Sequence, residues 1–313
     1  MPGFYCSRLK SSEEQRFAEI IEERWLNIRD DDTESIEITL QSEDEDAYNG
    51  ILRAGLAVMD NNPEIFYLKK LIKSSQRGNF VTISVDLLYS PFMIRVYKYM
   101  LDSIKTVIMM GASQNASPLE KEQMIFEYLQ TNVKYTDDGE AERSNIIGAL
   151  IQQKAVCSGI SKAFAYLCHH AGIPCICVFD DEHMWNIVKI DSHFTNVDAT
   201  YGTSCGLPHV NYTYFNVTDY EMSKHHNRST EFPPGCNWPY LSYYYRKGVI
   251  FNTKQELAAY VRYALEHKAG QINVKLTSGD IHEAVEAALD CVHEDLKYLY
   301  NPIQNTAAII RAS

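Results

Sequence analysis

The segment from Ala155 to Gly202 constrains the fold more than any other part of this 313-residue chain. Gly172 stands where a left-handed helix cap belongs, and Pro174 cannot continue a helix. Before them, apolar residues recur at helical spacing and predict one buried helix face: Ile160, Ala163, Phe164, Leu167, Cys168 and Ala171. The sequence therefore predicts a helix that begins at or near Cys157 and ends before Pro174.

Three strand-like stretches follow this helix, at 173–179, 183–190 and 193–200. A two-residue turn at Asp191-Ser192 would pair residue 190 with 193 and place Trp185 opposite Asp198. His183 is then the diagonal neighbour of Asp198 on the same face, roughly 7–8 Å away at Cα. An odd-length loop would put the two side chains on opposite faces. We therefore predict the even register and a hydrogen bond between His183 and Asp198.

These residues match the chemistry of a thiol enzyme. A cysteine in the first turn of a helix has its thiolate favoured by unpaired backbone amides and by the helix dipole. Cys157 would act as nucleophile, His183 as general base and acid, and Asp198 as the carboxylate that orients the imidazole. Ser158-Gly159 would keep the turn open to a substrate backbone.

Three motifs resemble those of the transglutaminase-like superfamily, in the expected order: Ala155-Val156-Cys157-Ser158-Gly159-Ile160-Ser161, His183-Met184-Trp185-Asn186-Ile187-Val188 and Asn196-Val197-Asp198-Ala199-Thr200. Ile160 departs from the aromatic residue of many bacterial members, which affects packing rather than chemistry. Two further segments resemble bacterial members: Tyr214-Phe215-Asn216 with Thr218-Asp219, and Asn62-Pro63-Glu64-Ile65-Phe66.

The resemblance implies an α+β fold with a papain-like core, in which the cysteine-bearing helix packs on an antiparallel sheet. It carries over Cys157, His183 and Asp198 as the catalytic triad. The Cys157 backbone amide is one expected oxyanion donor, and Tyr135, Trp185 and Ser158 are candidates for further oxyanion or substrate contacts. For Trp185, a place in the core is favoured over one in the wall of a substrate site.

The resemblance leads us to expect attack on an amide through a cysteine thioester, with water as acceptor in a peptide or amide hydrolase. An amine acceptor would instead make the protein a crosslinking acyltransferase. A binding module that keeps the scaffold without turnover is a third possibility. The expected partner is a protein or peptide substrate, and the sequence does not predict an oligomeric state.

The chain divides into three expected parts: a mostly helical N-terminal extension at 1–115, a catalytic core at 116–227 and a small αβ region at 228–313. Ser12 with Gln15, Ser117 with Glu120 and Thr253 with Glu256 resemble helix caps. Strands are expected at 36–40, 80–88 and 271–276, and helices at 91–110 and 281–298.

The net charge and the lack of long apolar segments argue against several classes of function. Lysine and arginine number 29 against 41 acids, a net charge of −12, which argues against a nucleic-acid ligand. No apolar run reaches the roughly 18 residues of a membrane span, and no signal sequence is visible, so we expect a cytoplasmic protein. The resemblance to bacterial members of the superfamily implies a bacterial protein.

No cofactor or metal is expected. Cys175-x-Cys177 is spaced too closely for a zinc site, His169-His170 suits a helix C-terminus, and His225-His226 with Lys224 and Arg228 suggests a solvated loop. Eight cysteines suggest disulfides, but a reactive Cys157 leaves seven, an odd number. Cys168, Cys175 and Cys177 are therefore expected to be packing residues.

Overall fold

The computed structural model describes residues 4–44, 46–113, 115–203, 209–226, 234–290, 292 and 295–311. The chain forms two compact units. Unit 1 comprises Met1–Ile125 and Thr136–Cys177, and unit 2 comprises Phe126–Tyr135 and Val178–Ser313. Both units combine helices with mostly antiparallel sheets, which confirms the expected α+β class. The three-part division of the chain stays a prediction.

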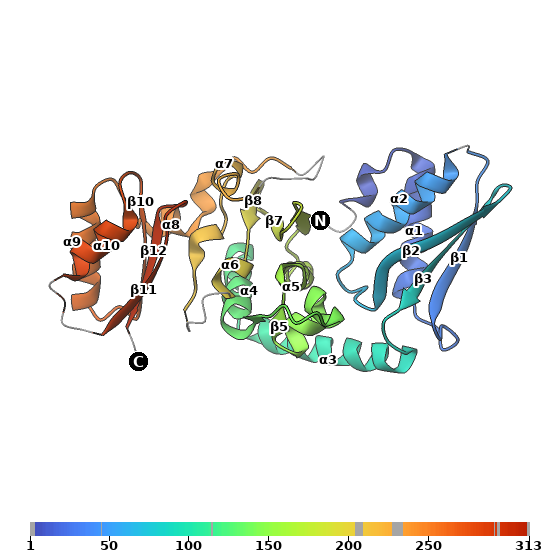
Figure 1. The fold of residues 1–313 in the computed structure, drawn as a ribbon, viewed down its shortest axis with the longest axis horizontal. Helices are drawn as coiled ribbons and strands as arrows, with labels where there is room; N and C mark the ends of the chain where they lie inside the picture. The colour runs from blue at the N-terminus through green and yellow to red at the C-terminus, as the bar shows by residue number, and fades with distance from the viewer. Residues whose placement is uncertain are drawn as a thin grey trace. The chain divides into compact units, whose positions relative to one another are not determined.

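Unit 1 begins with an αβ layer in which helices α1 and α2 accompany a sheet of order β1-β3-β2 (Figure 1). Its strands are antiparallel, and the buried residues of β1 and β3 alternate along one face. Gly55 of α2 lies so close to β2 that an added Cβ would be 2.9 Å from Ile72 Cδ1. The elements of this layer are α1 (Ser12–Leu26), β1 (Ser35–Gln41), α2 (Ala47–Asn61), β2 (Leu68–Arg77) and β3 (Phe80–Leu87), after a short 3-10 turn at Cys6–Arg8.

Two features of this layer differ from the sequence predictions. Strand β2 was not predicted, because its run of lysines and serines lacks the apolar alternation of a half-buried strand. Helix α1 is capped one residue earlier than expected: Ser11 Oγ accepts from Glu14 N at 3.1 Å, and Glu14 Oε2 accepts from Lys10 N at 2.9 Å. Ser11 thus takes the capping position that we assigned to Ser12.

The rest of unit 1 is mostly helical. The predicted cap at Ser117 is confirmed, since its side chain accepts from the backbone amide of Glu120, and Ser90 caps α3 in the same way. Residues Ile147–Ile151 form a single π-helical turn. These elements are α3 (Pro91–Met110), the first half of α4 (Pro118–Asn132), η2 (Ala141–Ser144), η3 (Ile147–Ile151), β5 (Lys154–Ala155) and α5 (Cys157–His170).

Unit 2 contains the predicted hairpin of β7 (Met184–Ile190) and β8 (His193–Val197). These strands form a sheet of order β6-β7-β8, and the chain passes from unit 1 to unit 2 within β6 (Cys175–Phe179). Short elements follow the hairpin: α6 (Thr200–Thr203), η4 (Tyr212–Tyr214), α7 (Asp219–Met222), η5 (Pro239–Leu241) and α8 (Tyr243–Lys247). Unit 2 also includes β4 (Lys134–Tyr135) and the second half of α4.

The C-terminal part of unit 2 is a four-stranded sheet of order β11-β12-β10-β9, with α9 and α10 packed together beside it (Figure 1). One apolar core, including Val261, Val274 and Val285, joins the helices to the sheet. The elements are β9 (Ile250–Phe251), α9 (Lys254–Glu266), β10 (Gln271–Leu276), α10 (Ile281–Leu289), β11 (Leu296–Asn301) and β12 (Thr306–Arg311).

The prediction of one long helix at 281–298 was wrong. Helix α10 ends at Leu289, and residues 296–301 form β11, which pairs antiparallel with β12. The partner strand, β12, lies closer to the C-terminus, and no strand was predicted there. Without a partner strand in the prediction, residues 296–298 were assigned to the helix. The predicted capping box of α9, formed by Thr253 and Glu256, is confirmed. Among the described residues, no helix is long and apolar enough to cross a membrane.

Candidate functional site

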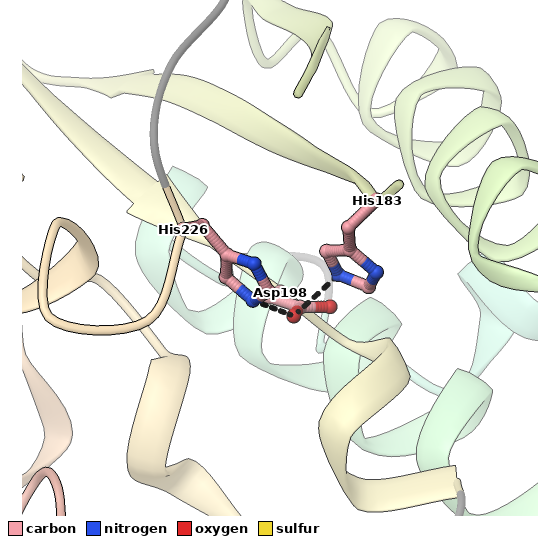
Figure 2. A group of neighbouring side chains, drawn as sticks. All are labelled: His183, Asp198 and His226. Atoms are coloured by element: carbon pink, nitrogen blue, oxygen red, sulfur yellow. Dashed lines mark hydrogen bonds and ion pairs between the residues drawn. The ribbon is translucent and has the colours of Figure 1, made fainter. Parts of the chain in front are cut away.

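His183 and Asp198 lie together in unit 2, as the predicted register requires. Asn186 pairs with Val197 and Ile190 pairs with His193, so the loop between β7 and β8 has two residues. Asp191 opens that loop with a φ of +53°, a left-handed conformation that aspartate tolerates in tight turns. The His183 Nε2 atom is 2.9 Å from Asp198 Oδ2 (Figure 2). Both the register and the predicted hydrogen bond are confirmed.

Asp198 is a buried carboxylate held in one orientation. Its residue is 2% exposed, and its Oδ1 accepts from Thr200 N at 2.9 Å. Burial acts to raise the pKa of Asp198, but the hydrogen bond from His183, the nearby His183 and His226 rings and the Thr200 amide together lower it below the ordinary value. Asp198 is therefore ionised near neutral pH, and its Oδ2 accepts a hydrogen bond from the Nε2–H group of His183.

A second imidazole, His226, completes the cluster (Figure 2). Its ring stacks on that of His183, with centroids 4.4 Å apart and planes 11° apart, and its Nε2 is 3.8 Å from Asp198 Oδ2. The prediction of a solvated loop at His225-His226 was wrong for His226, whose side chain is only 11% exposed. Arg228 of the same prediction lies outside the described residues.

The sequence offered no signal for His226, because it follows the three motifs in a polar stretch without periodicity. Its contacts depend on how the chain returns after α7 to the start of β7. Burial, the largest effect, and the neighbouring His183 lower the pKa of His226, although Asp198 acts in the opposite direction. His226 is thus a neutral ring near pH 7, and donor atoms of His183, Asp198 and His226 lie within 4.8 Å of one another.

Asp180 supports both histidines from the loop before β7. Its Oδ1 accepts from the backbone N of His183 at 2.7 Å, which fixes the start of the strand. Its Oδ2 lies 3.6 Å from His226 Nδ1, whereas Asp198 Oδ2 lies 3.8 Å from Nε2 of the same ring. Each ring nitrogen of His226 therefore faces a carboxylate oxygen.

Trp185 belongs to the core beneath the cluster. Its side chain is fully buried, and its Nε1 donates to Asn196 Oδ1 at 3.1 Å. Its ring stacks at 5.4 Å from that of His226 and at 6.3 Å from that of His183. Tyr135 also lies in unit 2 and is 39% exposed. The roles of Trp185 and Tyr135 in oxyanion or substrate binding remain predictions.

Cys157 and Ser158 lie in unit 1, at the predicted helix start. Cys157 is the first residue of α5, and its side chain is partly exposed. At the other end of α5, Gly172 has a φ of +76° and Ile173 N donates to Cys168 O at 2.8 Å, which closes the predicted left-handed cap.

Gly159 has a different role from the one predicted. An added Cβ would be 2.3 Å from Arg143 O and 3.1 Å from Asn145 O, so the glycine allows α5 to approach the backbone of η2. We had expected Ser158-Gly159 to leave room for a substrate. Gly159 instead serves packing against η2, a contact between separate segments that sequence spacing does not reveal.

The neighbouring cysteines are packing residues, as expected. Cys168, Cys175 and Cys177 are buried and form no disulfide within the described part of the chain, and Cys177 Sγ donates weakly to Ser161 O at 3.6 Å. His169 Nε2 lies 2.8 Å from the carbonyl oxygen of Cys175, which ties the end of α5 to β6. Cys205 and Cys291 lie outside the described residues.

Comparison with known proteins identifies the family of this segment. Residues 107–199, which contain Cys157, His183 and Asp198, match the profile of the transglutaminase-like superfamily. These residues belong to the transglutaminase-like superfamily. Its members are generally thiol enzymes related to cysteine proteases. No curated protein sequence matches the chain.

Two solved structures show weaker similarity to the chain. One is titled as a crystal structure of a TGase, with 15% identity and a TM-score of 0.30 over 64% of this chain and 59% of that one. The other is described as a candidate cysteine protease from Cytophaga hutchinsonii, with 12% identity and a TM-score of 0.27 over 42% of this chain and 61% of that one. The chain thus spans about three fifths of either structure. At these TM-scores the likeness carries no information about activity.

Proposed function

We propose that the protein is a thiol acyl-transfer enzyme that hydrolyses an amide bond in a protein or peptide, with Cys157, His183 and Asp198 as its catalytic triad. The observation that carries the proposal is the 2.9 Å contact between His183 Nε2 and the buried carboxylate of Asp198. An ordered histidine–carboxylate pair is what a cysteine nucleophile needs as its base. The position of Cys157 at the start of α5 and the family match support the same assignment.

The geometry of the pair supports a choice of nitrogen for the proposed base. Because Asp198 is ionised, its oxygen accepts the proton of His183 Nε2, and the lone pair of His183 is then on Nδ1. In the proposed mechanism Nδ1 takes the Cys157 proton, and the thiolate attacks the amide carbonyl carbon. Nδ1–H then protonates the leaving amine, and a water activated by the same nitrogen hydrolyses the thioester.

Reaction of Cys157 with iodoacetamide at mildly acidic pH tests the proposal. Among the described cysteines, Cys157 and Cys6 are the partly exposed ones. Burial and the nearby Glu22 raise the pKa of Cys6 to about 11, so Cys6 is a matched slow control. We expect Cys157 to react at least about 10-fold faster than Cys6, because an imidazole base stabilises its thiolate. Mass spectrometry of tryptic peptides measures both rates.

His183→Ala should abolish this difference, whereas Cys6→Ala should leave the rate at Cys157 unchanged. Equal rates at Cys157 and Cys6 in the wild-type protein, with no effect of His183→Ala, would contradict the catalytic assignment. That outcome would favour the rival interpretation, a binding module that keeps the scaffold without turnover.

A second experiment separates hydrolysis from crosslinking. The wild-type protein is incubated with a library of glutamine-containing peptides, with and without a primary amine, and with Cys157→Ala as the blank. Peptide cleavage or conversion of glutamine to glutamate would support hydrolysis, because water then resolves the thioester. Incorporation of the amine would instead identify a protein-glutamine acyltransferase. No turnover of any peptide would count against both enzymes.

A further inference from the structure

We propose that His183, Asp198 and His226 form a binding site for a zinc-type divalent metal ion, and that the ion switches the base of the enzyme off. The three donors are two imidazole nitrogens and one carboxylate oxygen (Figure 2), a ligand set that suits Zn²⁺ and leaves a fourth position for water. The inhibitory consequence rests on the proposed function, whereas the binding itself does not.

The spacing of the donor atoms fits such an ion. A tetrahedral zinc ion with ligands at about 2.0–2.1 Å holds its donor atoms roughly 3.3–3.4 Å apart. Asp198 Oδ2 lies 2.9 Å from His183 Nε2 and 3.8 Å from His226 Nε2, two distances that bracket this value. Thr200 N donates a hydrogen bond to Asp198 Oδ1, and Oδ2 is the oxygen that lies near both imidazole rings.

The surroundings of the cluster resemble the outer shell of a metal site. A histidine ligand usually donates its second ring N–H to a carboxylate, which fixes the tautomer and strengthens the ligand. Asp180 Oδ2 stands 3.6 Å from His226 Nδ1, whereas the other ring nitrogen, Nε2, is the one near Asp198. The same Asp180 holds the backbone of His183. Asp198 supplies a carboxylate that is 2% exposed.

Metal binding and base catalysis would exclude each other. When an ion binds His183 Nε2, the proton on that nitrogen moves to Nδ1, and Nδ1 loses the lone pair that would take the Cys157 proton. The ion also takes the place of that proton next to Asp198 Oδ2. Because the two rings stack within 11° of parallel, one of them must turn for both nitrogens to face the ion.

Equilibrium dialysis of the full chain against Zn²⁺ tests the binding. The Cys157→Ala background removes the reactive thiol, and the ion content is measured by elemental analysis. We expect Cys157→Ala to bind one ion more than Cys157→Ala/His226→Ala. Co²⁺ serves as the optical probe: the site should give an absorption spectrum without the sulfur charge-transfer band that thiolate ligands produce.

Matched variants make the assignment specific. Asp180→Asn should weaken the affinity by about 10–100-fold, the usual effect of losing an outer-shell carboxylate. His225→Ala should bind like the parent, because the ring of His225 packs beside Tyr214 and is not a donor of the cluster. Thermal unfolding without metal confirms that each variant is folded. Two results would overturn the proposal. One is equal binding by the His226→Ala and His225→Ala variants, and the other is a sulfur charge-transfer band in the Co²⁺ spectrum of the ion whose binding requires His226.

Inhibition is measured separately, as the rate of iodoacetamide reaction at Cys157 in the wild-type protein. We expect micromolar Zn²⁺ to slow this reaction and a chelator to restore it, with the half-effective concentration matching the dialysis result. Binding without any change in reactivity would overturn the switch while leaving the site intact. A Cys157 that is unreactive both with and without zinc would instead contradict the proposed function.

Discussion

At the scale of single residues, Asp198 is the group on which the site depends. One carboxylate accepts from the Thr200 amide and from His183, and it also faces the second imidazole of His226. Its burial makes its orientation definite, because a charge that is 2% exposed must keep its partners. A substitution of Asp198 that removes the charge but keeps a hydrogen-bonding side chain therefore tests whether the proposed catalysis needs the negative charge.

We expect Asp198→Asn to reduce amide turnover by about 10²–10⁴-fold, the range of general acid–base catalysis. The asparagine amide can donate to His183 Nε2, which would favour the tautomer with its proton on Nδ1 and remove the base. The measurement is kcat for the peptide substrate found in the library experiment, with thermal unfolding as the fold control. A loss of less than 10-fold would show that the tautomer does not limit the rate.

At the scale of elements, the position of α5 is set by close packing against η2. Val156 N donates to Arg143 O at 3.0 Å immediately before the helix, and Gly159 faces the same carbonyl oxygen. The first turn, which carries Cys157, is thus anchored through backbone contacts on one side. A glycine inside a helix costs about 1 kcal/mol of propensity, so its presence reflects this packing.

Gly159→Ala should lower the free energy of unfolding by roughly 1–3 kcal/mol, because a Cβ 2.3 Å from Arg143 O forces the helix to shift. Urea unfolding at pH 7 measures the change. Gly270→Ala is the control: an added Cβ there meets nothing within 4 Å, so we expect a change within about 0.5 kcal/mol. Equal stability of the two variants would show that α5 has room to adjust.

At the scale of the whole molecule, a largely buried ion pair ties the chain after the hairpin to the C-terminal sheet inside unit 2. Lys275 Nζ of β10 bonds to Glu221 Oε1 of α7, and Gln304 Nε2 donates to the Glu221 carbonyl oxygen. Burial acts to raise the pKa of Glu221, but Lys275 and the Thr218 donors together outweigh it and lower the pKa. Folding therefore depends on pH through this group.

A carboxyl group with a lowered folded-state pKa stabilises the fold above its unfolded pKa of about 4.3, and this contribution is lost as the pH falls through the folded value. Glu221→Gln should cost roughly 1.5–3 kcal/mol at pH 7 and much less in acid. Urea unfolding of both proteins at a series of pH values, from 7 down to below the pKa of the unfolded glutamate, measures the difference in free energy of unfolding.

Glu256→Gln is the matched control, since Glu256 occupies the same capping-box position in α9 but is exposed at the surface. We expect its effect to stay within about 0.5 kcal/mol at every pH. A pH-independent loss for Glu221→Gln would mean that the hydrogen bonds of the cap matter rather than the charge.

The sequence by itself determined the features that depend on neighbouring residues. The α5 stripe with its Gly172 cap, the caps at Ser117 and Thr253, and the two-residue turn are all local. The even register followed from the turn length, because side chains alternate with a period of two along a strand. The His183–Asp198 contact could therefore be predicted from counting alone.

Only the tertiary structure decided the features that involve a distant partner. Strands β2 and β11 form because a neighbouring strand satisfies their backbone groups, although β2 lacks an apolar pattern. Gly159 serves contact with η2, and His226 reaches the catalytic pair through the path of the chain after α7. Such contacts join residues far apart in sequence, and their energy comes from packing and hydrogen bonding that no local pattern records.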